Sequence, residues 1–336
     1  MNLYQYSAVT FCIYLCVPCI AASSACAAEK PNIVVILADD MGYGDCSANN
    51  PESKISTLNI DRLATEGMRF TDAHSGGSSC IPSRYALITG RFAVRASMAL
   101  AKGPLIEEGR MTVPSLLREH GYATAMVGKW HLGFDPSLQN KKAPADYSNP
   151  LRGDPVDRGF DSFFGMHASL DPPPYFYIRD RRPVLPPTDD VSASSSVGGP
   201  KGWNNIQGAF WREGKMAPDL QFDQVTPRFF DEAVNVIQKH RVDKKDNSLF
   251  LYLALPSPHT PWLPLEEFRG KSSAGLDGDF VLQVDAGVGR VLQALKAAGI
   301  DKDMLRWYCS PATTVLSGTR RTSRNSDTMP SAGCGE

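Results

Sequence analysis

Two uninterrupted apolar runs constrain the fold of this chain more than any other feature. The first, Pro31–Asp40, ends in two adjacent acids, Asp39 and Asp40, and the second, Leu249–Leu255, is followed within four residues by His259. Apolar runs without polar alternation are typical of parallel strands that are buried on both faces. In open α/β sheets, functional groups gather at the carboxyl ends of such strands. The sequence therefore predicts an α/β fold with polar groups at one sheet edge.

Segments with helical spacing alternate with these strands. Thr57–Gly67 ends in a glycine stop, and Thr112–Gly121 begins with a capping threonine and ends in another glycine. Tyr122–Val127 follows as a strand, while Pro227–His240 and Phe280–Ala298 are amphipathic helices. The alternation predicts a doubly wound, mostly parallel sheet sandwiched by helices.

Cys80 is a candidate nucleophile in a loop that leads into a helix. We expect Met68–His74 to be the strand before this loop, Pro82 to lie in the first helical turn and Gly90 to end the helix. Unpaired N–H groups at a helix N-terminus favour anions and activate a thiol. Arg84 lies one turn further on and brings a positive charge toward the thiol. A buried structural cysteine beside a helix cap would have the same local pattern.

Two further pairs of polar residues follow predicted strands. Lys129 and His131 are two residues apart, so they point to one side of an extended chain and suit a sulfate or phosphate oxyanion. An exposed basic loop is the alternative for this pair. Asp39 and Asp40 would repel each other unless a cation lay between them, and their oxygens suit Ca²⁺ or Mg²⁺. A solvated turn is the alternative for the acidic pair.

Several of these patterns together resemble the type I sulfatases, formylglycine-dependent arylsulfatases of the alkaline phosphatase superfamily. Cys80–Arg84, with Thr89-Gly90-Arg91 after it, resembles their C-x-P-S-R signature, and Gly121–His131 resembles their second signature. Pro31–Asp40 resembles their opening strand, and Ser257–Pro261 the motif whose histidine contacts the sulfate ester. The resemblance covers residues 31–300.

The resemblance implies hydrolysis of sulfate esters of aryl groups or carbohydrates. Cys80 would be oxidised to formylglycine by a maturation enzyme, and the hydrated aldehyde would be the nucleophile. Asp39 and Asp40, together with position 80, would hold Ca²⁺, with Mg²⁺ as the alternative. The resemblance implies four further catalytic residues, Arg84, Lys129, His131 and His259. They would hold the nucleophile, bind sulfate oxygens or protonate the leaving group.

The resemblance ends after residue 300. A sulfatase should continue into a strand ending in Ser-Asp-Asn-Gly, whose Asp and Asn complete the metal site, and then into a smaller C-terminal domain. Here the residues from 310 onward are rich in Ser, Thr, Arg and Gly. We therefore expect residues 29–304 to form a partial catalytic domain, residues 305–336 to be an aberrant, disordered tail, and the chain to be truncated or frameshifted. A phosphodiesterase or phosphonate hydrolase of the same superfamily and an inactive remnant are the alternatives.

The first 28 residues resemble a secretory signal peptide, with an apolar stretch over 8–22 and an A-x-A-type site at Ala25–Ala27. A lipoprotein with lipidated Cys26 and an uncleaved anchor are alternatives. Four of the eight cysteines lie in this leader, so no disulfide framework is expected. A net charge of −1 argues against a nucleic acid partner. We expect an exported protein with a sulfated small molecule or glycan as substrate, a maturation enzyme as partner and no stable membrane partner.

Residues 135–225 are rich in Pro, Gly, Ser and Asp, and a loop region of this length is often functional. Its aromatic side chains either line a sugar- or aryl-binding cleft or pack beneath the loops. These residues are Tyr175, Phe176, Tyr177, Trp203 and Trp211.

Overall fold

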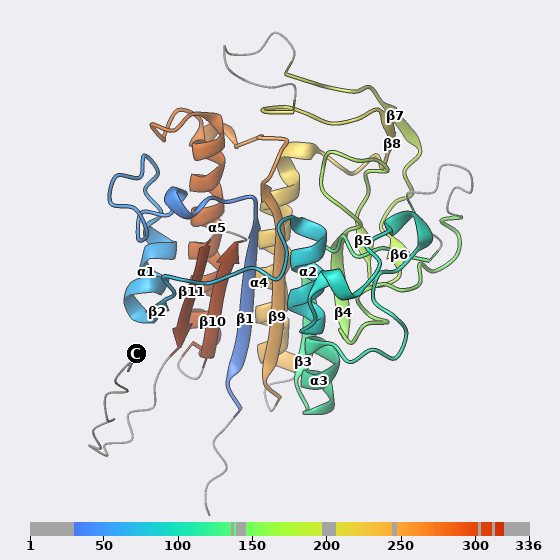
Figure 1. The fold of residues 1–336 in the computed structure, drawn as a ribbon, viewed down its shortest axis with the longest axis horizontal. Coiled ribbons are helices and arrows are strands. Elements are labelled where there is room, and N and C mark those ends of the chain that lie inside the picture. The colour runs from blue at the N-terminus through green and yellow to red at the C-terminus, as the bar shows by residue number, and fades with distance from the viewer. Residues whose placement is uncertain are drawn as a thin grey trace, which may run out of the picture.

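The structure is a computed structural model that describes residues 30–135, 138, 146–196, 206–243, 247–301, 304–310 and 313–318. Within these ranges one mixed sheet of nine strands has the order β2-β11-β10-β1-β9-β3-β4-β5-β6 (Figure 1). The central strands run parallel to one another. They are β10 (Met304–Ser310), β1 (Asn32–Asp39), β9 (Leu249–Pro258), β3 (Ala123–Lys129) and β4 (Ser162–Met166).

Antiparallel strands extend both edges of this parallel centre. On one side β11 (Thr313–Gly318) pairs with β10, and β2 (Met68–Arg69) pairs with β11. On the other side β5 (Ile178–Arg179) pairs with β4, and β6 (Arg182–Pro183) pairs with β5. A separate hairpin consists of β7 (Asp189–Val191) and β8 (Gly214–Met216).

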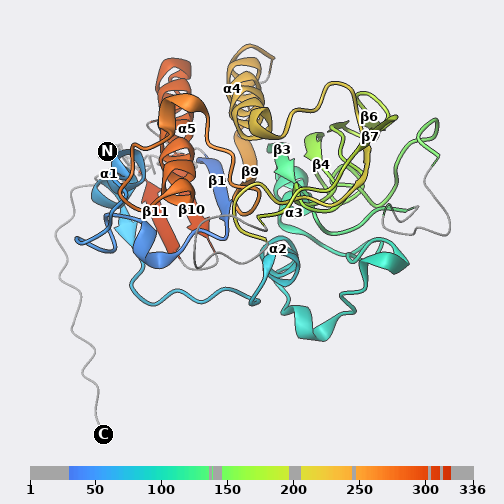
Figure 2. The same cartoon turned by 90° about the horizontal axis from the view of Figure 1, so that it is seen from above.

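Helices cover both faces of the sheet. Figure 2 shows α4 and α5 on one face, with α1 beside α5, and α2 and α3 on the other face. The bounds are α1 (Leu58–Glu66), α2 (Cys80–Thr89), α3 (Val113–Glu119), α4 (Val225–Asp243) and α5 (Leu276–Ala298). Five short 3₁₀ helices are also present in the described ranges: η1 (Tyr43–Asp45), η2 (Ala93–Arg95), η3 (Leu100–Lys102), η4 (Phe222–Gln224) and η5 (Glu266–Phe268).

Side-chain alternation along β9 explains the two cores. Leu251 and Leu253 pack with α4 and α5 in one apolar cluster, whereas Phe250 and Tyr252 pack in the second cluster on the face of α2. Because both faces are covered, every residue of β9 is buried, as the unbroken apolar run requires. The predicted doubly wound, mostly parallel sheet sandwiched by helices is confirmed.

The structure also differs from two local expectations. The strand expected over Met68–His74 has only two residues, Met68 and Arg69, because its pairing is limited to Val315 and Leu316 of β11 at the sheet edge. The tail expected from residue 305 contains β10 and β11. β10 fills the open edge of β1, whose backbone groups would otherwise lack partners. The rest of that tail, residues 319–336, lies outside the described residues.

The leader predicted over residues 1–28 also lies outside the described residues. None of the helices in the described ranges combines the length and the apolar character that crossing a bilayer requires.

Candidate active site

The predicted site residues gather at the carboxyl edge of three adjacent strands, β1, β9 and β3. Asp39 ends β1, Lys129 ends β3, and His259 follows the last residue of β9. Cys80 is the first residue of α2, which packs against the same edge region. The topology therefore brings together residues that are up to 220 positions apart in the chain, Asp39 to His259.

Cys80 lies next to a neutral histidine. Its half-buried Sγ lies 3.4 Å from Nδ1 of His131, within hydrogen-bond distance. Burial lowers the pKa of His131 well below its usual value, and the positive charges of Lys129 and Arg84 lower it further. The imidazole is therefore uncharged at neutral pH and can accept a proton from a group at position 80.

The backbone at the strand ends is unusual. His131 has a φ of 56° and Asp40 a φ of 62°, a left-handed conformation that costs a non-glycine residue about 1–3 kcal/mol and is concentrated at functional sites. Gly128 has a φ of 115°, and a Cβ there would lie 2.0 Å from the carbonyl oxygen of Ala254 in β9. Only glycine permits this close approach, which sets the position of Lys129.

A buried network joins the three strands to α2. Arg84 donates from Nη1 to the Lys129 carbonyl oxygen at 2.7 Å and from Nη2 to the Leu255 carbonyl oxygen at 3.0 Å. Nη2 is also 3.5 Å from Oδ1 of Asp39. Lys129 Nζ donates to Oδ2 of Asp39 and, at 2.6 Å, to Oγ of Ser169.

The network carries a net positive charge. Burial opposes ionisation of Asp39, but Lys129 and Arg84 outweigh burial and hold the pKa of its carboxyl below the usual value. One carboxylate therefore faces two cations, and all three side chains are almost completely buried. Arg84 Nε is buried and has no hydrogen bond partner among the described residues. The unbalanced charge and the unused donor favour an anion at this place.

His259 presents one ring nitrogen to the site. Its Nδ1–H donates to the Thr260 carbonyl oxygen at 2.6 Å, and its Nε2 is 3.6 Å from Oδ2 of Asp40. The His259 side chain is 17% exposed and that of Asp40 is 57% exposed. The partly exposed ring is therefore suited to exchanging a proton with a bound substrate.

Asp39 and Asp40 are oxygen donors suited to a divalent cation, but the described residues do not complete a metal site. No group of three or more His, Cys, Asp or Glu side chains in the described ranges is arranged to hold a metal ion. The Asp39 carboxylate is already paired with Lys129 and Arg84. β10, the neighbour of β1, ends at Ser310, and it is followed in the sequence by Pro311 and Ala312 in place of the expected Asp and Asn ligands.

Ser169 is the site residue that sequence reasoning missed. It follows β4 at the same sheet edge, is buried, and orients the Lys129 ammonium group. Its position after a strand was the available signal, but a lone serine carries no recognisable pattern. His167 nearby packs structurally: its Nε2 bonds to the Pro174 carbonyl oxygen at 2.7 Å, and burial lowers its pKa to about 4.

The described aromatic residues that were considered for a sugar cleft pack beneath the loops instead. Tyr175, Phe176 and Tyr177 are buried, and Trp211 stacks on Phe222 with ring centroids 4.6 Å apart. Trp203 lies outside the described residues.

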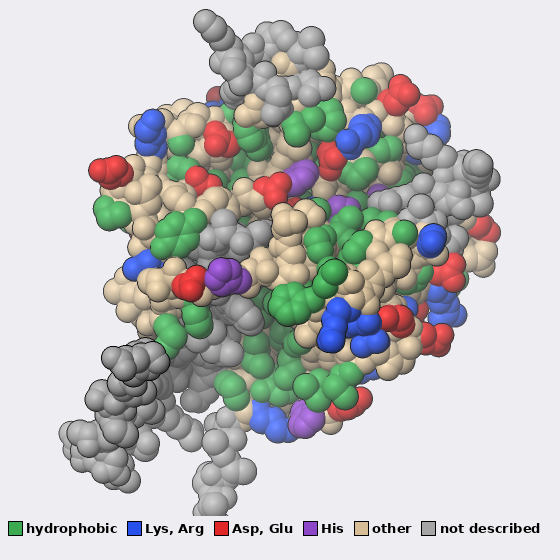
Figure 3. Space-filling view, in the orientation of Figure 1, with side chains coloured by type: hydrophobic (Ala, Val, Ile, Leu, Met, Phe, Trp, Pro, Cys, Tyr) green, Lys and Arg blue, Asp and Glu red, His purple; other side chains and the backbone are tan. Residues whose placement is uncertain are grey.

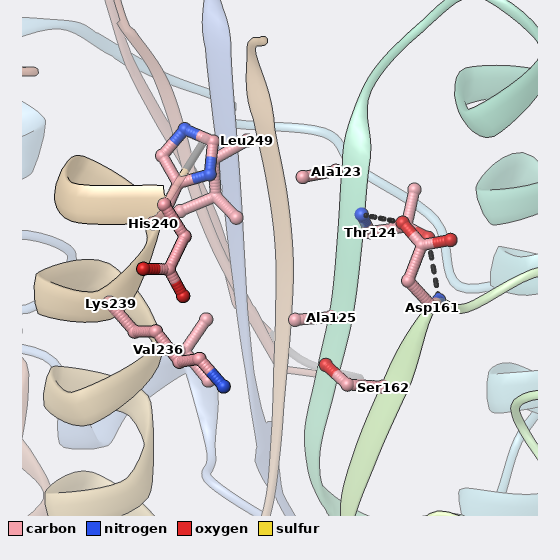
Figure 4. Close-up of a pocket in the computed structure, with 10 residues that line it drawn as sticks. Ala123, Thr124, Ala125, Asp161, Ser162, Val236, Lys239, His240 and Leu249 are labelled. Carbon is pink, nitrogen blue, oxygen red and sulfur yellow. Dashed lines mark hydrogen bonds between the residues drawn. The ribbon is translucent and has the colours of Figure 1, made fainter. Parts of the chain in front are cut away.

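A pocket of about 200 Å³ lies at the opposite edge, between the amino ends of β3, β4 and β9 and the end of α4 (Figure 4). Asp161 in its wall accepts a hydrogen bond from the Thr124 N–H at 2.9 Å, and α4 contributes Lys239 and His240. Ligands of open α/β sheets bind at the carboxyl edge, so we place the candidate active site at Asp39, Lys129 and His259 and not in this pocket.

Comparisons with known proteins identify relatives of this chain in sequence and in structure. A family model described as Sulfatase matches residues 31–310. The N-acetylgalactosamine-6-O-sulfatase of Bacteroides thetaiotaomicron is 31% identical over 315 residues, which cover 86% of this chain and 60% of that protein. The N-acetylgalactosamine-6-sulfatase of Mus musculus is 31% identical over 305 residues, which cover 87% of this chain and 52% of that protein. The chain thus spans between about half and two thirds of the length of these relatives.

Two solved structures are similar in fold and sequence. One, described in work on glycosaminoglycan metabolism by Bacteroides thetaiotaomicron, has a TM-score of 0.72 and 27% identity over 84% of this chain and 63% of its own. The other, Ps i-CgsB in complex with k-i-k-neocarrahexaose, has a TM-score of 0.59 and 28% identity over 84% of this chain and 58% of its own.

Proposed function

The chain belongs to the sulfatase family, and we propose that it binds and hydrolyses sulfate esters, with formylglycine formed from Cys80 as the nucleophile. The observation that carries this proposal is the buried excess of positive charge at Lys129 and Arg84 beside the Cys80–His131 pair. A sulfate ester is an anion whose oxygens accept hydrogen bonds, so it supplies the missing negative charge. The names of the relatives, N-acetylgalactosamine-6-sulfatases, support a sulfated sugar as the substrate.

In the proposed reaction, a maturation enzyme first oxidises Cβ of Cys80 with an external oxidant; the C–S bond breaks, sulfide leaves, and oxygen from the oxidant or from water gives an aldehyde. Water adds to the aldehyde and gives a geminal diol, which Arg84 Nε and His131 hydrogen-bond. One diol hydroxyl loses its proton to solvent as its oxygen attacks sulfur, and the S–O bond to the sugar oxygen breaks. His259 gives that oxygen a proton, so that the product leaves as an alcohol.

The second half of the reaction restores the aldehyde. The remaining hydroxyl gives its proton to His131, and its electron pair forms the C=O bond. The C–O bond to the sulfate group breaks, and sulfate leaves with both electrons of that bond. Lys129 holds the sulfate oxygens during both steps, since its ammonium group is fixed by Asp39 and Ser169. A low pKa suits His131 to this role, because the base must be neutral before each turnover.

Sulfatases use a divalent cation, and the implied ligands here are Asp39 and Asp40 with position 80. Such a cation would polarise the sulfate group and align the nucleophile. In the described part of the chain no third carboxylate or amide joins these two carboxylates, and a site with so few protein ligands has weak affinity. We therefore propose that Ca²⁺ or Mg²⁺ binds weakly, and no step above depends on it. We also propose that the protein is exported, because residues 1–28 resemble a secretory signal peptide.

The test uses the chain coexpressed with a formylglycine-generating enzyme. Peptide mass spectrometry across Cys80 measures the aldehyde, and sulfate release is followed from 4-nitrophenyl sulfate and from N-acetylgalactosamine 6-sulfate. We expect release that Cys80→Ala abolishes, and slower turnover of bis(4-nitrophenyl) phosphate. Turnover that survives in the Cys80→Ala variant would refute the nucleophile assignment. Faster cleavage of the phosphate diester would favour a phosphodiesterase instead.

A further inference from the structure

A pocket of about 210 Å³ opens beside His259, next to the sulfate-binding residues but with different chemistry. Its walls come from β1, η1, the segment after β9 and the start of α5. Figure 3 shows acidic side chains and a histidine close together on this face, above the sheet. The side chains that define its character are Asp40, Asp45, Gln207, His259, Trp262 and Asp277.

The wall opposite β1 is fixed in place before any ligand binds. The Thr260 hydroxyl donates to the Ile206 carbonyl oxygen at 2.6 Å, and the Trp262 N–H donates to the Gly208 carbonyl oxygen at 2.8 Å. These bonds tie Ile206–Gly208 to the segment that carries His259. A preformed wall loses little conformational freedom on binding, so the pocket is suited to a rigid ligand.

The charge of the pocket is the reverse of the charge at Lys129. Three carboxylates, those of Asp40, Asp45 and Asp277, line it, and neither Lys nor Arg is among its lining residues. Asp45 and Asp277 are close enough for the negative charge of Asp277 to raise the pKa of Asp45, in addition to the larger effect of burial. A second anionic group of a substrate would meet like charges here, which is unfavourable.

Asp45 and Asp277, unlike Asp40, are not among the implied ligands of the cation. Among the described residues no three acidic, His or Cys side chains are arranged to hold a metal ion. Carboxylates that are free of a metal accept hydrogen bonds from hydroxyl groups, and the Gln207 amide both donates and accepts. Trp262 adds an aromatic surface to the same wall. Hydroxyl groups on a rigid ring, together with its apolar C–H face, match this set of groups.

We propose that the pocket binds an uncharged, hydroxyl-rich sugar ring of the sulfated substrate, and that Asp45 and Asp277 reject rings bearing a second sulfate or a carboxylate. The inference rests on the proposed function, since the sulfate at Lys129 sets the position of the ring. His259 connects the two parts of the site: it lines the pocket, and because its Nδ1 bonds to the Thr260 carbonyl oxygen, Nε2 is the nitrogen that would face the ester oxygen. The substrate class is therefore a glycan with one sulfate per recognised ring.

The test measures binding, so that it does not depend on turnover. Isothermal titration calorimetry at low salt uses the full chain with Cys80 unmodified. The probes are inorganic sulfate, N-acetylgalactosamine, its 6-sulfate and its 4,6-disulfate. We expect the monosulfate to bind at least about tenfold more tightly than the disulfate. The variant with both Asp45→Asn and Asp277→Asn should reduce this ratio to below about threefold without changing the affinity for inorganic sulfate.

Two further variants separate a sugar contact from a general effect. Trp262→Ala should weaken both N-acetylgalactosamine and its 6-sulfate by about tenfold and leave inorganic sulfate unchanged. Glu108→Gln, an exposed acid outside the pocket, is the matched control and should change nothing. Equal affinities of the wild-type chain for the monosulfate and the disulfate would overturn the proposal. So would an absence of binding by every sugar probe.

The outcomes also separate this proposal from the proposed function. Binding of the unsulfated sugar that depends on Trp262, without any binding of inorganic sulfate, would refute the sulfate site and retain the sugar pocket. Binding of inorganic sulfate without preference among the sugars would retain the sulfate site and refute the pocket.

Discussion

Replacing Asp39 with asparagine should destabilise the protein and, at the same time, strengthen its affinity for sulfate. The Asp39 side chain is 2% exposed and neutralises part of the charge of Lys129 and Arg84. Removing one partner of a buried ion pair costs about 3–5 kcal/mol, because the remaining charge stays buried and unpaired. The asparagine oxygen still accepts a hydrogen bond from Lys129, so we expect a cost near the lower limit, about 3 kcal/mol.

Urea unfolding measures this cost. With a denaturant dependence of about 3 kcal/mol per molar urea, the midpoint of the Asp39→Asn variant should fall by about 1 M. Asp231→Asn is the matched control, since it breaks an exposed ion pair with Arg290 and should leave the midpoint almost unchanged. The same experiment in sulfate tests the charge argument, because bound sulfate stabilises only the folded state.

The net charge of the network rises from one to two in the Asp39→Asn variant, so a bound anion should recover part of the lost stability. If the affinity for sulfate rises by about tenfold, saturating sulfate should stabilise the variant by about 1.4 kcal/mol more than the wild type. Sodium chloride at equal ionic strength controls for screening. A variant as stable as the wild type, or an equal response of both proteins to sulfate, would show that Asp39 does not balance these two cations.

Three further predictions concern pH, backbone geometry and metal. The pKa values of His131 and His167 are both lowered in the folded state, that of His167 to about 4. The free energy of unfolding should therefore decrease as the pH drops below about 6.5, the pKa of an unfolded histidine, and continue to decrease toward the folded pKa values. In a variant carrying both His131→Gln and His167→Gln, the urea midpoints at pH 7.5 and 5.5 should converge. Gly128→Ala should lower the free energy of unfolding by about 3 kcal/mol or more, because its Cβ would overlap the Ala254 carbonyl oxygen. Gly90→Ala, with open space at a φ of 64°, should lower it by about 1 kcal/mol. Equal losses of stability in thermal unfolding would contradict the close approach at Gly128. Removal of divalent cations with EDTA should leave the urea midpoint and inorganic sulfate binding unchanged, and Ca²⁺ should bind with a Kd weaker than about 1 mM by calorimetry; tighter binding would show that a third ligand completes the site.

The sequence predicted the central strands and most helices because their signals are local. The runs that became β1 and β9 lack polar alternation, and both strands are buried on both faces. The Thr112 cap was readable for the same reason: its side chain accepts a hydrogen bond from the Ser115 N–H, three residues away. The sequence also indicated which functional residues share an edge, since Asp39 and Lys129 end their strands and His259 follows one directly.

What could not be predicted depends on contacts between distant segments. Arg84 interacts electrostatically with Cys80, as expected. Its hydrogen bonds to the Lys129 and Leu255 carbonyl oxygens could not be predicted, because those residues belong to two strands that α2 meets only in the folded protein. Ser169 orients Lys129 across 40 residues without any pattern in the sequence. β10 was missed because its partner is β1, more than 270 positions earlier.

The geometry separates anion binding from catalysis within one site. Binding depends on Lys129, Arg84 and Asp39, whose positions are fixed by strands and by hydrogen bonds to backbone carbonyl oxygens. Catalysis depends in addition on a chemical change at Cys80. A chain with an unmodified thiol should therefore bind sulfate and release none from an ester, whereas a chain with a damaged network should do neither, even with the aldehyde in place. Measuring sulfate affinity and ester turnover on the same preparation consequently distinguishes a failure of maturation from a failure of the site.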